Sequence, residues 1–207
     1  MLSPAIPPGD DEIQLFGDAS YQYLITTGSW AFSAPALGLE GAGTGNGPSI
    51  EHFEIMAVVQ GITTIINLDR TRRPIRVHTD SELAIRLLQC AVKDEPLPSR
   101  KSFDRLRALY ERARALTGHR HLLAGKVSSL RPEHQECHRR AAKRLRDELA
   151  ADAVLAWRLA LRKEETRLEA VLKEKTTFQA RLGALDEEEL LLGIRIRALT
   201  QTRPPFN

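Results

Sequence analysis

The sequence is poor in cysteine, has no long apolar run and has few aromatic residues (5%). Its two cysteines, Cys90 and Cys137, give no disulfide framework, so we expect the cytoplasm or another reducing intracellular compartment. No apolar segment approaches the ~20 residues that a membrane-spanning helix needs, and we expect no membrane partner. The first residues lack a basic segment followed by an apolar one, so they do not resemble a signal peptide.

Strong charge of one sign is also absent, because the formal net charge is only +3 over 207 residues. Any surface that contacts nucleic acid must therefore be local. The length suffices for one domain with a core and an extension. We expect a flexible Pro-rich lead-in over residues 1–12, an α/β domain over residues 13–150 and a helical extension over residues 151–207.

The apolar pattern predicts strands first and mostly helices later. Three strands over 13–23, 24–34 and 36–41 would form an antiparallel meander. The glycine-rich segment 41–47 is interpreted as a flexible connection, because it lacks the spacing of a dinucleotide fingerprint and the Lys-Ser/Thr of a P-loop. The later pattern predicts elements in the order helix, strand, helix, helix, strand, at 50–67, 75–79, after Ser81, 99–117 and 121–127.

The C-terminal third reads as helical. From about Glu133 to Leu182 there is no proline or glycine, and Gly183 is expected to separate this long helix from a shorter one over 186–200. From Val154 on, apolar residues at heptad spacing are typical of a coiled coil. Such a stripe must be buried on something, so a homodimer, a protein partner, or a helical hairpin that folds back on its own domain are all open.

Three acidic residues occupy related places in this order of elements. Asp18 ends the first strand, Glu54 lies in the first turns of the helix over 50–67, and Asp80 ends the fourth strand, ahead of a helix that Ser81 could cap. Open α/β sheets bind ligands at that edge. Converging carboxylates repel one another and need cations in order to ionise together. Two Mg²⁺ or Mn²⁺ ions would suit these hard oxygen ligands and would clamp the oxygens of a phosphodiester displacement.

Three motifs resemble the leading motifs of the type 1 ribonuclease H family, in the same order: Phe16-Gly-Asp-Ala-Ser20, Glu51-His-Phe-Glu-Ile-Met-Ala57 and Val77-His-Thr-Asp-Ser81. The resemblance spans roughly residues 13–149. It implies a ribonuclease H-like five-stranded mixed sheet flanked by helices, followed here by a long helix or helical hairpin. It also implies hydrolysis of the RNA strand of RNA/DNA hybrids.

The resemblance assigns roles to the acids. Asp18 would bridge both metal ions, Glu54 would hold the ion near the leaving group, and Asp80 would hold the ion near the attacking water. The family's fourth acid is replaced, because Pro132-Glu-His-Gln-Glu-Cys-His-Arg139 places His134 at the family's Asn and His138 at its Asp. We expect His138 to be the fourth catalytic and metal-binding residue, with a shift toward Mn²⁺ and lower activity when His138 is protonated.

Other departures leave alternatives open. Ser128 stands where the family has a mobile histidine for product release, which favours a nucleic-acid binding module without turnover. A histidine in the fourth position resembles some Holliday-junction resolvases, which favours a DNA-junction nuclease. A zinc site on one helix, without a clear fourth ligand, is a further alternative; it would use His134, Cys137 and His138.

The resemblance also implies contacts with the hybrid. Three arginines recur at heptad spacing on the helix predicted over 99–117, and we expect them to contact phosphates of the partner strand. Ser20, Ser81 and His134 lie in or beside the motifs and are candidates for further contacts. The arginines are Arg100, Arg107 and Arg114.

Overall fold

The computed structural model describes residues 11–98, 101–104 and 106–201. Most of the predicted lead-in, Arg100 and the last residues of the chain lie outside these ranges. The chain divides into two compact units, residues 1–156 and 157–207. Within the described ranges, no helix is both long enough and apolar enough to cross a membrane.

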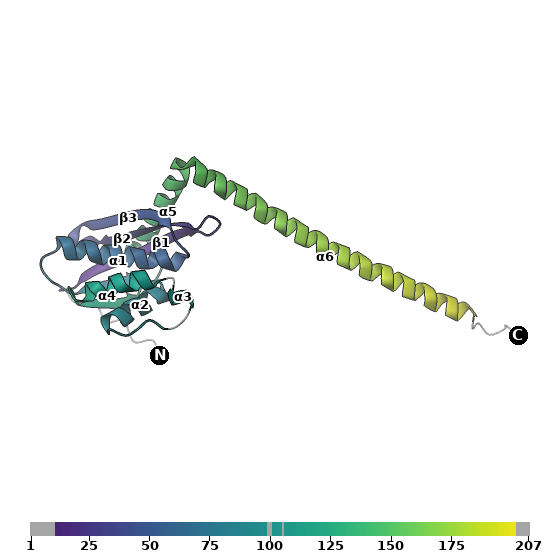
Figure 1. Ribbon diagram of the computed structural model, residues 1–207, viewed down its shortest axis with the longest axis horizontal. Coiled ribbons are helices and arrows are strands. Elements are labelled where there is room, and N and C mark those ends of the chain that lie inside the picture. Colours follow the sequence, from purple (N-terminus) through teal and green to yellow (C-terminus); the bar gives the residue numbers. More distant parts are fainter. Residues whose placement is uncertain (1–10, 99–100, 105, 202–207) are drawn as a thin grey trace. The chain divides into compact units, whose positions relative to one another are not determined.

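The first unit is built on a five-stranded mixed sheet with the strand order β3-β2-β1-β4-β5 (Figure 1). β1 pairs antiparallel with β2, and β2 pairs antiparallel with β3. β4 is parallel to both of its neighbours, β1 and β5. The strands are β1 (Ile13–Gln22), β2 (Thr27–Ala34), β3 (Leu39–Asn46), β4 (Ile75–Thr79) and β5 (Leu122–Lys126).

Helices cover both faces of this sheet, which confirms the predicted fold class. The helices are α1 (Ile50–Leu68), α2 (Glu82–Val92), α3 (Lys101–Asp104), α4 (Arg107–Thr117), α5 (Pro132–Ala151) and α6 (Ala153–Gln201), with a 3₁₀ turn η1 (Pro35–Leu37). Figure 1 shows α1, α2 and α4 on one side of the sheet and α5 on the other. On the α5 side, the Ser29 hydroxyl donates to the Ala141 carbonyl at 2.6 Å.

The main core lies between the sheet and the helices α1, α2 and α4, as the broad apolar stripe of α1 predicts. Its buried members include Leu15, Ile62, Val77, Leu87 and Tyr110. A smaller cluster on the other face joins Phe16, Val127 and Cys137. β1 thus has core on both faces, and successive residues of β1 point alternately to α1 and to α5.

The glycine-rich segment 41–47 is not a flexible connection: most of it is the edge strand β3. The third strand therefore runs later than predicted, over Leu39–Asn46. Gly41 pairs with Phe32 and Gly43 with Trp30. The rings lie over the glycines so closely that an added Cβ would come within 2.5 Å of Phe32 and 2.6 Å of Trp30. Aromatic side chains from β2 thus fill the space that β3 leaves empty, and glycine is what fits beneath them.

Two helix boundaries also differ from the prediction. The helix predicted over 99–117 is interrupted, with α3 ending at Asp104 and α4 beginning at Arg107. The long C-terminal helix breaks at Asp152 instead of Gly183. Asp152 leaves helical geometry, and its side chain accepts hydrogen bonds from the amides of Val154 and Leu155, which caps α6. α6 then continues through Gly183 as one helix of 49 residues, so the second unit is no hairpin.

Candidate active site

An open cleft of about 620 Å³ lies where β1 and β4 meet the first turns of α1 and α5. Most of its polar lining comes from residues that are far apart in the sequence. It is lined by Asp18, Ala19, Ser20, Tyr21, Ile50, Glu54, Asp80, Ser129, His134, Gln135, His138 and Arg139.

Asp18 is the buried centre of the cleft. It follows Phe16 by two residues on β1, so its side chain lies on the α5 face of the sheet. The amide of Ala19 donates to Asp18 Oδ1 at 2.6 Å. Burial raises the pKa of Asp18, and the charge of Asp80 acts in the same direction; the Ala19 amide and the imidazoles of His134 and His138 oppose this rise.

Two histidines of α5 face Asp18. α5 begins with Pro132 at its first turn, and the two histidines are four residues apart, so they share one face of the helix. His134 Nδ1 lies 3.8 Å and His138 Nδ1 lies 3.1 Å from Asp18 Oδ2. His134 exposes only 2% of its side chain, whereas His138 exposes 61%.

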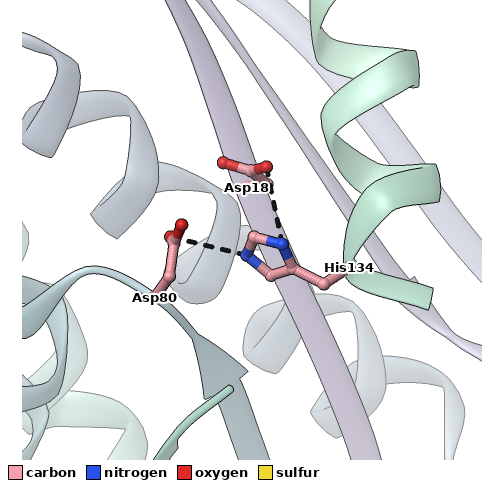
Figure 2. Close-up of side chains that lie close together, drawn as sticks. All are labelled: Asp18, Asp80 and His134. Carbon is pink, nitrogen blue, oxygen red and sulfur yellow. Dashed lines mark ion pairs between the residues drawn. The ribbon is translucent and has the colours of Figure 1, made fainter. Parts of the chain in front are cut away.

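Asp80 completes the group from the other side of His134. It directly follows β4, and its Oδ1 lies 3.4 Å from His134 Nε2. Figure 2 shows the His134 ring between the two carboxylates. The Ser81 hydroxyl accepts a hydrogen bond from the Ala84 amide and caps α2, as predicted. Asp80 is therefore not needed as a cap, and 39% of its side chain remains exposed toward the cleft.

Glu54 supplies a third carboxylate from the first turns of α1. Burial raises its pKa to about 7, and the neighbouring charges of Asp80 and Asp18 add to this rise, while a hydrogen bond with Ser81 lowers it. The cleft therefore gathers three carboxyl groups, two of which are held away from their ordinary pKa by burial and by one another. Such crowding is typical of sites that bind cations.

The side chains present fit a divalent metal ion. Ligand atoms of Asp18, Asp80 and His134 all lie within 4.8 Å of one another. His134 Nε2 is buried and makes no hydrogen bond with the described residues, although Asp80 Oδ1 lies 3.4 Å away. In the tautomer protonated at Nδ1, this nitrogen could serve as a metal ligand. Two carboxylates and one imidazole suit Mn²⁺ and accept Mg²⁺. Glu54 and His138 line the same cleft but are not in this closest group.

The zinc alternative on α5 lacks its sulfur ligand. Cys137 is buried against Phe16, and its Sγ donates to the Phe16 carbonyl at 3.6 Å. Burial raises the pKa of this thiol to about 12, which disfavours the thiolate that zinc requires. Cys137 therefore serves the packing of α5 on β1.

The predicted nucleic-acid contacts are only partly at the cleft. Ser20 and His134 line it, whereas the Ser81 hydroxyl is the α2 cap. Arg107 and Arg114 line a separate hollow near α4, where Arg107 pairs with Asp104 and Arg114 with Asp94. Arg100 lies outside the described residues.

Two polar residues of α5 that line the cleft were not predicted from the sequence. Gln135 and Arg139 each follow one of the histidines and share their side of α5. The spacing i, i+1, i+4, i+5 from His134 is the signal that could have identified them, because it marks one helix face. Arg139 lies at the rim of this acidic cleft, where its guanidinium forms an ion pair with Glu136 at 2.8 Å.

No protein-family model matches the sequence, and no curated protein matches it either. Several solved structures are similar to this chain. The N-terminal RNase H domain of rv2228c from Mycobacterium tuberculosis is 15% identical, with a TM-score of 0.53 over 69% of this chain and 99% of that one. LC11-RNase H1 in complex with an RNA/DNA hybrid is 11% identical, with a TM-score of 0.54 over 66% of this chain and 99% of that one.

A second structure of LC11-RNase H1, isolated from compost by a metagenomic approach, is 12% identical, with a TM-score of 0.53 over 67% of this chain and 99% of that one. At such identities the likeness establishes the fold alone. The first unit therefore has the ribonuclease H-like fold that the three motifs predict.

Proposed function

We propose that this chain is a metal-dependent endonuclease that hydrolyses the RNA strand of RNA/DNA hybrids with two Mg²⁺ or Mn²⁺ ions. The observation that carries the proposal is the convergence of Asp18, Asp80 and His134 in an open cleft of a ribonuclease H-like fold. A hybrid is the favoured substrate because one protein of similar fold is in complex with an RNA/DNA hybrid.

Each side chain of the cleft has a distinct task in this proposal. Asp18 and Asp80 would hold the metal with His134, and Glu54 adds a carboxyl group whose pKa is raised to about 7 by burial. Bound ions would supply the positive charge that stabilises the attacking and leaving oxygens. Arg139 and Gln135, at the rim, are placed to contact a phosphate and so to orient the strand.

The first prediction tests turnover. We expect the protein to cut a labelled RNA/DNA hybrid in Mg²⁺ or Mn²⁺, and Asp80→Asn to lower the rate more than about 100-fold, because it removes one of three converging ligands. The measurement is the single-turnover cleavage rate. Asp147→Asn is the matched control, because Asp147 is an exposed acid outside the cleft and should leave the rate unchanged.

Single-stranded RNA, duplex DNA and a four-way DNA junction belong in the same assay. Preferred cutting of the junction would establish the DNA-junction nuclease instead. If no substrate is cut in either metal while circular dichroism shows a folded protein, the enzyme proposal is wrong.

One observation favours the second candidate, a nucleic-acid binding module without turnover. The His134 imidazole already lies between Asp18 and Asp80, so in its protonated form it would contact both carboxylates and offset one of their two negative charges in place of a cation. Such a protein would bind a hybrid with equal affinity in EDTA and in Mn²⁺, and would cut nothing. Fluorescence anisotropy of a labelled hybrid, measured beside the cleavage assay, distinguishes the two candidates.

A further inference from the structure

α6 carries a long apolar seam that nothing in the described part of the chain covers. Its positions recur at alternating spacings of three and four residues, and all but two of them are apolar. Each apolar member exposes between 42% and 63% of its surface. A seam of this kind is the contact face of a coiled coil. The members are Val154, Trp157, Leu161, Leu168, Val171, Phe178, Leu182 and Leu185.

Two charged residues interrupt the seam. Glu164 and Lys175 occupy seam positions, are exposed, and make no ion pair with the described residues within 4 Å. In water a charge there costs little, but in a buried seam it must meet an opposite charge. Their positions therefore restrict which helix can cover α6, and in which register.

We propose that α6 pairs with α6 of a second copy of this chain as an antiparallel coiled coil, centred between Glu169 and Ala170. In this register Glu164 of each copy faces Lys175 of the other. The pair therefore contains two such Glu–Lys contacts, and every charged seam residue meets an opposite charge. Every remaining seam position faces an apolar residue. The facing pairs are Val154 with Leu185, Trp157 with Leu182, Leu161 with Phe178 and Leu168 with Val171.

The other arrangements of two copies are disfavoured by the same two charges. A parallel pair would place Glu164 against Glu164 and Lys175 against Lys175, with like charges in contact. An antiparallel pair shifted by one heptad would place Glu164 against Leu168 or Leu182, and each charge would be buried without a partner. Polar residues at seam positions are known to select register and orientation in this way.

Residues beside the seam agree with the centred register. Arg167 and Glu174 flank the seam on the same side, and the register brings Arg167 of one copy beside Glu174 of the other. This adds two more opposite-charge contacts across the pair. A second copy thus satisfies the whole central part of the seam, so neither an unrelated partner nor the chain's own first unit is required.

The oligomeric state of the full-length chain tests the proposal. Sedimentation equilibrium should show a dimer. Glu164→Lys and Lys175→Glu should each raise the dissociation constant about tenfold or more, because each brings like charges together twice. The double variant Glu164→Lys/Lys175→Glu should restore the wild-type constant. A monomer at about 100 μM, a trimer, or single variants that leave the constant unchanged would overturn the proposal.

Cysteine crosslinking tests the orientation. Leu161→Cys and Phe178→Cys chains, mixed and oxidised, should form a disulfide between unlike chains, because these positions face each other. The native cysteines are buried and serve as internal controls in the peptide map. Disulfides between like chains only, 161 to 161 and 178 to 178, would show a parallel pair. The proposal does not rest on the proposed function, since neither experiment measures cleavage.

Discussion

The two histidines of α5 differ in their surroundings more than in their distance from Asp18. His134 is enclosed between Asp18 and Asp80, while His138 reaches Asp18 from the solvent side. A ligand that is already fixed by packing loses less conformational freedom on binding. We therefore infer that His134 contributes more to metal affinity than His138, the residue that the family resemblance selects.

We expect His134→Ala to weaken Mn²⁺ binding by about 10- to 100-fold and His138→Ala to weaken it clearly less. Isothermal titration calorimetry on the protein without nucleic acid measures both affinities. If His138→Ala weakens Mn²⁺ binding more than His134→Ala does, His138 is the more important ligand, as the family resemblance implies. Gln135→Ala, on the same helix face but outside the closest group, controls for a general disturbance of α5.

The sequence predicted that three acids lie close together, and all three line one cleft, because each has a local signal. Asp18 and Asp80 follow β-branched or alternating apolar runs, and Glu54 lies at the start of an apolar stripe. The choice between His134 and His138 has no such signal. It depends on the position of α5 along β1. This position is fixed by the packing of Cys137 on Phe16, and the two residues are 121 positions apart in the sequence.

β3 is a strand that its own sequence does not predict. Glycine has low strand propensity, so the segment 41–47 predicts a loop. Its strand character comes from Trp30 and Phe32, whose rings on β2 occupy the space above Gly43 and Gly41. This packing joins two segments, and neither one indicates it alone.

Gly41→Ala should therefore lower the free energy of unfolding by about 1–3 kcal/mol, because the new Cβ would meet the buried Phe32 ring. Gly45→Ala on the same strand is the matched control. A Cβ there meets nothing within 4 Å, so we expect no loss, or a slight gain from a less flexible unfolded chain. Urea unfolding of both variants measures the difference, and equal values would refute the packing argument.

An ion pair joins the end of α1 to the segment that leads into β5. Arg120 Nη1 lies 2.9 Å from Asp69 Oδ2, and the two side chains expose only 3% and 9%. Burial raises the pKa of Asp69, but hydrogen bonds from Thr71 and Arg120 outweigh it, so the net pKa is lowered from 3.8. The pair thus contributes stability above pH 4, which is lost as the pH falls through the lowered pKa of the folded state.

Asp69→Asn should destabilise the fold by about 3 kcal/mol at pH 7, because Arg120 is left buried without its counter-charge. The difference from wild type should begin to shrink as the pH falls below about 4, where Asp69 takes up a proton in the unfolded chain, and should disappear once the pH is below the lowered pKa of the folded state. Denaturant unfolding at pH 7 and pH 3 measures both values. A difference that does not change with pH would contradict the role given to this carboxylate.

On the scale of the whole molecule, the two units have different sources of stability. The first unit has a core of its own between the sheet and α1, α2 and α4. α6 has an apolar seam without a core, and an isolated helix gains little from its own hydrogen bonds. The apolar heptad is visible in the sequence because it is a local pattern, and α6 runs through Gly183, where the sequence predicted a break. A single glycine costs about 1 kcal/mol, which a 49-residue helix tolerates.

Thermal unfolding should therefore show two transitions. The one assigned to α6 should rise in temperature with protein concentration if pairing stabilises it, and the one assigned to the first unit should not. Circular dichroism at 222 nm records both transitions, because both units contain helices. The fluorescence of Trp30 in a Trp157→Phe background identifies the transition that belongs to the sheet. A single transition that is independent of concentration would contradict this division.

The position of α5 also predicts the order in which the parts of the cleft come together during folding. The bonds that fix α5 on the sheet, from Ser29 to Ala141 and from Asp18 to His138, close loops of 112 and 120 residues. Long loops close late, because their entropy is lost before many contacts form. We therefore expect the carboxylates to be in place before the histidines arrive. A growing chain would acquire its complete cleft only as its last sheet-covering helix docks, so the proposed activity would be switched on by the final step of folding.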